Sequence, residues 1–172
     1  KRLFNINPNN LIEISKNTNE VLGQIENIFS EYNVDIKHIK RPKKDEIELN
    51  SETVHIVGQY AKKGFRLGDI CHAIGEYVEK NGYSVVREFQ GHGIGESMHE
   101  DPGIPNYGKA GRGIRLEPGM TLAIEPMVIM GKPNILELDD GWTIITEDGS
   151  LAAHYENTIL ITENEPEILT LL

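Results

Sequence analysis

Apolar and polar residues follow two different periods along the chain, and the change comes near residue 51. From residue 9 to residue 32 the apolar positions recur in steps of three and four, which is the period of an amphipathic helix. The following stretch, 37–50, is polar, highly charged and interrupted by Pro42, so we place a boundary at residue 50. The stripe of the predicted helix consists of Leu11, Ile14, Thr18, Val21, Leu22, Ile25, Ile28, Phe29 and Tyr32.

Two further helices are predicted after this boundary. The first spans residues 51–63, with Ser51 as its N-cap and Gly64 at its end. The second begins at Asp69, and Asn81–Gly82 ends it, because glycine tolerates the left-handed conformation that closes a helix. The second helix has one apolar face, formed by Ile70, Ala73, Ile74, Tyr77 and Val78.

The rest of the chain has the alternation and composition of strands. Residues 91–102, GHGIGESMHEDP, and the glycine-rich stretch 108–119 are expected to be loops. Residues 147–150, EDGS, predict a turn that joins the last two strands as a hairpin. Two helices followed by a mostly antiparallel sheet predict an α+β fold. The expected strands are 83–89, 120–130, 142–146 and 154–162.

Alternation along two of these strands separates core positions from carboxylates. In residues 120–126, the side chain of Glu125 shares a face with the small residues Thr121 and Ala123, opposite three apolar residues. In residues 154–162, Glu156 shares a face with His154 and Thr158. An unpaired carboxylate in the middle of a sheet is costly. A metal ion or a buried arginine would remove that cost.

The stretch 91–102 offers a nitrogen donor for such an ion. His92 lies between Gly91 and Gly93, and glycine permits tight turns and the close approach of another group. One imidazole and two carboxylates suit Mn²⁺, Fe²⁺, Co²⁺ or Zn²⁺, and a carboxylate can bridge two ions. Glu125 and Glu156 taken singly are equally consistent with structural ion pairs. The residues alone therefore leave both interpretations open.

Composition limits the class of partner. The formal net charge is −10 and the isoelectric point is about 5.1, which argues against binding to nucleic acid or to anionic membranes. The longest apolar runs fall short of the roughly 18 residues that span a bilayer, and the first residues lack the apolar stretch of a signal peptide. A single cysteine, Cys71, suits a reducing compartment. We therefore expect a cytoplasmic protein.

Residues 51–172 resemble the second half of a type I methionine aminopeptidase, a metallopeptidase with the pita-bread fold. The resemblance runs in order through three segments of the chain. It implies a pita-bread-like α+β half-domain, with two helices packed on a mostly antiparallel sheet and preceded here by the N-terminal helix and linker, 1–50. The segments are YSVVREFQGHGIGESMHEDPGIPNYG, LEPGMTLAIEPMV and DGWTIITEDGSLAAHYENTILITENEPEILT.

The resemblance also implies roles for five residues. His92 and Glu125 resemble metal ligands of the family, and Glu156 resembles the glutamate that bridges two ions. His99 resembles a histidine that contacts the substrate and stabilises the tetrahedral intermediate, and Trp142 resembles an aromatic residue of the methionine pocket. The implied reaction is removal of N-terminal methionine from nascent peptides by metal-bound hydroxide. It would use two divalent ions per complete site, drawn from Co, Mn, Fe or Zn.

The chain departs from the family pattern at several positions. The aspartate ligand pair and the second substrate-binding histidine of the first half have no counterpart here. Asp35 and Asp45 do not replace the pair, because Asp45 leads almost directly into the helix at 51. Two ions would therefore have too few ligands from one chain. Local departures are Ala123, His154 and Asn157, where the family usually has threonine, glutamine and histidine.

Three hypotheses account for these features. The first is a shortened metallo-aminopeptidase whose second-half residues are intact. The second is a non-catalytic module that binds peptide N-termini or a protein partner. The third is a symmetric homodimer in which His92, Glu125 and Glu156 of each chain surround one centre and restore the number of ligands.

Overall fold

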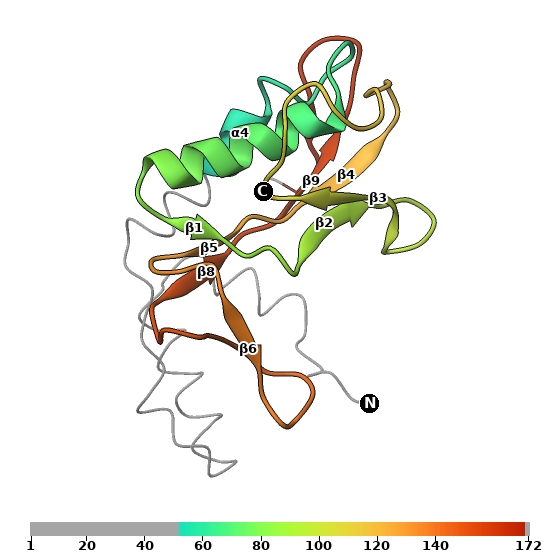
Figure 1. The fold of residues 1–172 in the computed structure, drawn as a ribbon. Helices are drawn as coiled ribbons and strands as arrows, with labels where there is room; N and C mark the ends of the chain where they lie inside the picture. The colour runs from blue at the N-terminus through green and yellow to red at the C-terminus, as the bar shows by residue number, and fades with distance from the viewer. Residues whose placement is uncertain (1–51, 171–172) are drawn as a thin grey trace, which may run out of the picture. The chain divides into compact units, whose positions relative to one another are not determined.

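The computed structural model describes residues 52–170, in which two helices precede ten short strands (Figure 1). The first helix covers 52–57, and α4 covers Leu67–Lys80. The helix expected at 9–32 and the cap expected at Ser51 lie outside the described residues. The strands are β1 Ser84–Val85, β2 Gln90–Gly93, β3 Glu100–Pro105, β4 Thr121–Ile124, β5 Met127–Ile129, β6 Ile135–Glu137, β7 Ile144–Thr146, β8 Ala152–His154, β9 Asn157–Leu160 and β10 Glu167–Ile168.

These strands form three sheets in which neighbouring strands are antiparallel. The largest has the order β10-β9-β4-β2-β3, and the second has the order β1-β5-β8. The third is the β6-β7 pair, which lies away from α4 in the ribbon (Figure 1). Two helices and antiparallel sheets confirm the predicted α+β class.

The two larger sheets are joined through two adjacent breaks. The chain leaves β4 and enters β5 through Glu125 and Pro126, and it leaves β8 and enters β9 through Tyr155 and Glu156. Ile124 pairs with Asn157 at the end of β4, and Met127 pairs with His154 at the start of β5. Each strand advances by three residues between these pairs, so the register is the same on both sides of the breaks. The Tyr155 N–H donates to the Pro126 carbonyl at 3.2 Å, as this register requires. Glu125 therefore lies opposite Glu156.

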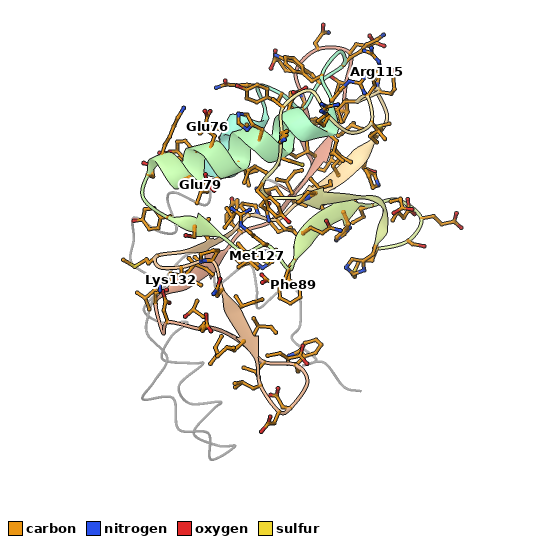
Figure 2. The ribbon with its side chains drawn as sticks, in the orientation of Figure 1. Glu76, Glu79, Phe89, Arg115, Met127 and Lys132 are labelled. Carbon is orange, nitrogen blue, oxygen red and sulfur yellow. The ribbon has the colours of Figure 1, made fainter. Side chains whose placement is uncertain are left out.

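One face of the largest sheet carries the hydrophobic core. Helix α4 lies over one face of the sheet that contains β4 and β9 (Figure 1). Leu122, Ile124 and Ile159 belong to the same core cluster as side chains of α4 and of helix 52–57. Figure 2 labels Glu76 and Glu79 on α4, and these exposed residues pair with Lys80 and Arg87, respectively. The core cluster consists of Val54, Val57, Ala61, Leu67, Ile70, Cys71, Ile74, Ile104, Leu116, Leu122, Ile124, Ile159 and Ile161.

The predicted helices need two corrections. The first ends at residue 57 and continues as turns, rather than reaching residue 63. The N-cap of α4 is Arg66, and Asp69 lies one turn later, where its Oδ2 accepts a hydrogen bond from the Arg66 N–H at 2.7 Å. Asp69 is thus the third residue of the helix rather than its N-cap, and its side chain accepts the hydrogen bond of the N-cap N–H. The predicted end is confirmed, since Gly82 has a φ of 82°.

The predicted strands and loops need more correction. The strand at 83–89 is formed only at 84–85, and the two long strands are each broken at their carboxylate. The expected hairpin is wrong, because β7 pairs with β6 and β8 pairs with β5. The expected loop 91–102 contains most of β2 and the start of β3. Its glycines serve strand packing, since a Cβ on Gly91 would collide with the Ala123 carbonyl oxygen of the neighbouring strand.

The single thiol provides a probe of this fold. Cys71 is 3% exposed in the core, and burial raises the pKa of its thiol to about 11. Because only the thiolate reacts, the raised pKa alone makes alkylation at pH 7.5 about a hundredfold slower than for an ordinary thiol. We expect slow iodoacetamide labelling of the native chain and rapid labelling in guanidinium. Rapid labelling without denaturant would contradict the described packing of α4.

Candidate metal centre

Three chain segments bring a histidine and two glutamates together on the face opposite the core. His92 belongs to β2, Glu125 follows β4, and Glu156 precedes β9. One donor atom from each of the three side chains lies within 4.8 Å of the others. The three residues that the sequence suggested as metal ligands are thus neighbours, although they are separated by up to 64 positions in the chain.

Strand register explains this convergence. His92 pairs with Ala123, and Ala123 pairs with Thr158, so these three side chains share one face of the sheet. Glu125 lies two residues after Ala123, and Glu156 lies two residues before Thr158, which puts both carboxylates on that same face. Ala123 is fully buried and small, and it leaves room between the three donors.

The two carboxylates repel each other in this arrangement. Like charges directly opposite on paired strands are destabilising. Burial raises the pKa of the Glu125 carboxyl, and the charge of Glu156 raises it further, against smaller opposing effects of His92, His154 and His99. The charged form of Glu125 therefore lowers the stability of the fold at neutral pH. The Oε1 atom of Glu125 is buried and accepts no hydrogen bond. A cation would remove both costs.

The orientation of the His92 ring suits a metal ligand. Its Nδ1 lies 2.8 Å from the Gly93 carbonyl oxygen, which can only accept, so Nδ1 carries the proton and the neutral ring has its lone pair on Nε2. That Nε2 lies 3.3 Å from Glu125 Oε1 without forming a hydrogen bond. Two acceptor atoms at this separation are placed like two ligands of one ion with bonds of about 2.1 Å.

Two further histidines and an asparagine adjoin the trio. The ring of His99 lies 4.2 Å from that of His92, centroid to centroid, and is exposed. His154 places its Nε2 at 3.5 Å from Glu125 Oε2, although the sequence analysis gave it no role. Strand alternation puts His154 on the same face as Glu156, and this feature of the sequence could have identified His154 as a neighbour of the site. The Asn106 amide, fully buried, donates to the backbone carbonyl of Glu125 at 2.8 Å and holds the break in place.

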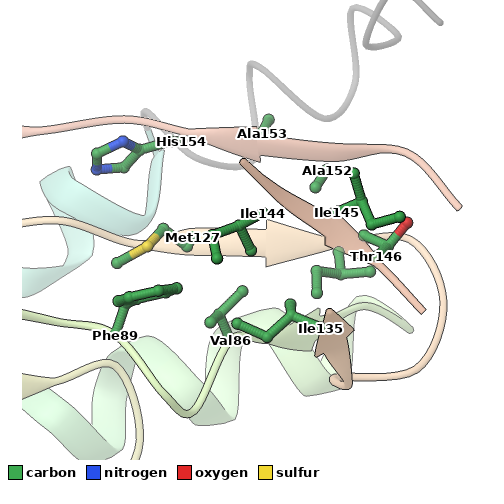
Figure 3. Close-up of a pocket in the computed structure, with 11 residues that line it drawn as sticks. Val86, Phe89, Met127, Ile135, Ile144, Ile145, Thr146, Ala152, Ala153 and His154 are labelled. Atoms are coloured by element: carbon green, nitrogen blue, oxygen red, sulfur yellow. The ribbon is translucent and has the colours of Figure 1, made fainter. Parts of the chain in front are cut away.

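Trp142 lies apart from this group in the connection between β6 and β7. The residue is 72% exposed, and its backbone N–H donates to Asp140 Oδ1 at 3.0 Å. Its role in a methionine pocket stays a prediction. An apolar pocket of about 360 Å³ does adjoin the centre, and Figure 3 shows His154 beside Met127 and Phe89 in it. The lining residues are Val86, Phe89, Met127, Ile129, Ile135, Ile144, Ile145, Thr146, Ala152, Ala153 and His154.

The donor set fits a divalent cation. Imidazole nitrogen with two carboxylates is a combination that binds Mn²⁺, Fe²⁺, Co²⁺ or Zn²⁺. The unpaired Glu125 Oε1 and the free lone pair of His92 face the same space, and two negative charges oppose each other there. A site built for an ordinary ion pair would instead contain a lysine or arginine, and none lies within salt-bridge distance of Glu125 or Glu156 among residues 52–170.

Replacing Glu125 by glutamine tests the electrostatic argument. Without metal, we expect Glu125→Gln to raise the free energy of unfolding by roughly 0.5 kcal/mol, because it removes the repulsion with Glu156. With saturating Mn²⁺ or Zn²⁺, the parent chain should gain stability and the variant should gain much less. Thermal unfolding with and without metal measures both effects. Glu137→Gln, an exposed strand position, is the control and should change neither value.

Comparison with known proteins agrees with this geometry. Metallopeptidase family M24 matches residues 24–163. The methionine aminopeptidases of Clostridium perfringens and Clostridium acetobutylicum are 62% and 61% identical over 107 and 125 residues, which are 62% and 73% of this chain and 43% and 50% of those proteins. The crystal structure of methionine aminopeptidase from Thermotoga maritima matches with 50% identity and a TM-score of 0.73, over 75% of this chain and 52% of that one.

The chain thus spans about half the length of the curated relatives that it matches. No helix among residues 52–170 is long and apolar enough to cross a membrane. The family match covers most of the chain and includes all three members of the trio. The chain therefore belongs to metallopeptidase family M24, has the α+β pita-bread fold of that family, and carries a site for divalent metal.

Proposed function

We propose that this chain supplies one half of a metal-dependent aminopeptidase site that removes N-terminal methionine from nascent peptides. The observation that carries the proposal is the convergence of His92, Glu125 and Glu156 around an unpaired, buried carboxylate oxygen. Relatives that are 52–62% identical over this region are named methionine aminopeptidases, which supports the same substrate class. The proposal also places the protein in the cytoplasm, where nascent chains are made.

Each residue of the centre has a distinct task in this proposal. His92 and Glu125 would hold one ion, and Glu156, the more exposed carboxylate, would bridge it to a second one; Co, Mn, Fe and Zn all suit these donors. Divalent metal supplies Lewis acidity, which activates water and polarises the scissile carbonyl. His99, which is exposed beside His92, would donate a hydrogen bond to the peptide. Trp142 would contact the methionine side chain.

We further propose that the remaining donors come from outside the described residues. Three protein ligands are too few for two ions, since each needs four or more. The homodimer hypothesis provides one source, because a second copy presents the same three donors across a twofold axis. Apolar side chains are exposed on the β6–β7 hairpin, among them Leu136 and Ile145. They support an interface at this hairpin.

Metal titration of the whole chain, combined with a turnover assay, tests the proposed function. We expect calorimetry with Mn²⁺ or Co²⁺ to give two ions per complete site, and a Met-Ala-Ser peptide to lose its methionine in the same sample. Glu156→Gln should abolish turnover and reduce the number of bound ions. Glu167→Gln, on the exposed edge of the same sheet, is the matched control. Absence of metal binding by the parent chain would contradict the proposal.

A second function is favoured by the small donor set itself. A module that binds peptide N-termini without cleaving them needs no second ion, and three protein donors completed by a water suffice to hold one. This alternative predicts that the chain binds one ion and the Met-Ala-Ser peptide, with no release of methionine. Peptide binding measured by fluorescence anisotropy, beside the turnover assay, separates the two functions.

The homodimer has its own test. If a second copy completes the site, we expect sedimentation velocity to show a dimer whose fraction increases with Mn²⁺, because the ions link the two chains. His92→Ala should weaken this metal-dependent association, since it removes one donor from each chain. A chain that stays monomeric with the metal saturated would rule out the homodimer and leave the other two hypotheses standing.

A further inference from the structure

Two imidazoles contact the same glutamate from different sides. His92 Nε2 lies 3.3 Å from Glu125 Oε1, and His154 Nε2 lies 3.5 Å from Glu125 Oε2. His154 is the last residue of β8 and pairs with Met127, so it is diagonal to Glu125 across the strand pair. Each carboxylate oxygen of Glu125 therefore has one histidine of its own.

The two histidines differ in their surroundings. The His92 side chain is 15% exposed and its ring is fixed by the Gly93 carbonyl, whereas the His154 side chain is 49% exposed. His92 belongs to the group of donors that converge within 4.8 Å, and His154 does not, among the residues that the structure describes. This geometry makes His92 a ligand and gives His154 a different role.

We propose that His154 is a positioning residue for Glu125. Its Nε2 lies 3.5 Å from Glu125 Oε2, and an Nε2–H there attracts that oxygen and leaves Oε1, which accepts no hydrogen bond, turned towards the ion. Ligands of a metal are commonly held this way by a hydrogen bond to their second oxygen or nitrogen. The inference rests on the proposed function, because it assumes that Glu125 binds a metal ion.

The apolar pocket beside the centre supports a fixed orientation of the His154 ring. His154 lies at one end of this pocket, next to Met127 and Phe89 (Figure 3). Most of the pocket lining is apolar, so on that side the Glu125 carboxylate is the charged group near Nε2. The rest of the ring is exposed, since the side chain is 49% exposed.

The proposal requires opposite tautomers in the two rings. In His92 the proton is on Nδ1, because Nδ1 faces the Gly93 carbonyl oxygen. In His154 the proposed role requires the proton on Nε2, the ring atom that lies 3.5 Å from Glu125 Oε2. A His154 that bound an ion through Nε2 would carry its proton on Nδ1 instead. The tautomer of His154 therefore distinguishes positioning from ligation.

Three substitutions test the role through metal affinity. Glutamine can place an N–H where histidine has Nε2, asparagine can place one only where histidine has Nδ1, and leucine has none. We expect His154→Gln to keep the Mn²⁺ affinity of the parent within about threefold. His154→Asn and His154→Leu should each lose about tenfold or more, the usual cost of removing such a partner. Calorimetry on the whole chain measures each affinity, and His55→Gln, an exposed histidine of the first helix, is the control.

Nitrogen-15 NMR of the histidine rings gives an independent readout. In spectra recorded near pH 8.5, the ring nitrogen shifts identify the atom that carries the proton. We expect the Nε2–H form for His154 and the Nδ1–H form for His92, assigned through their single variants.

The outcomes separate this inference from the proposed function. Equal affinity of the parent and all three His154 variants, or an Nδ1–H tautomer at His154, would overturn the positioning role while the metal site stands. Loss of affinity in His154→Gln as large as in His154→Leu would also overturn it, because a ligand or a purely structural role predicts that result. If the parent chain binds no Mn²⁺, the proposed function itself fails.

Discussion

The opposition of two carboxylates across one strand pair governs this structure. Glu125 and Glu156 face each other where β4 passes into β5 and β8 passes into β9, and both strands lose their regular pairing there. Pro126, which has no N–H to donate, lies at the same point of the strand. The fold thus holds two opposed carboxylates, one of them largely buried, and a cation between them would relieve the repulsion.

The rest of the described fold supports that opposition. Helix 52–57 and α4 cover the other face of β4 and β9, so the strands are anchored by a continuous apolar core. Asn106 fixes the backbone at Glu125 from the neighbouring hairpin, and the glycines of β2 let that strand approach closely enough to bring in His92. A rigid core on one face thus allows an electrostatically unfavourable arrangement on the other, which is typical of functional sites.

The same geometry connects the centre to its surroundings in two directions. His99 lies exposed beside His92, and His154 lies next to Glu125 and lines an apolar pocket. The family comparison gives these contacts a chemical context, because the matched relatives are metallopeptidases about twice as long as the matched region. The described residues thus contain three metal donors on one face of the sheet, together with exposed apolar side chains on the β6–β7 hairpin.

The sequence by itself determined the face of each strand on which a side chain lies, because alternation depends only on the two-residue period of extended chain. It therefore separated Ile124 from Glu125 and placed His154 with Glu156, and helix periodicity identified the buried face of α4. Register, strand partners and breaks came only from the tertiary structure. Alternation cannot show that residue 125 lies opposite residue 156, that β7 pairs with β6, or that a glycine-rich stretch forms a strand, because each depends on contacts between distant segments.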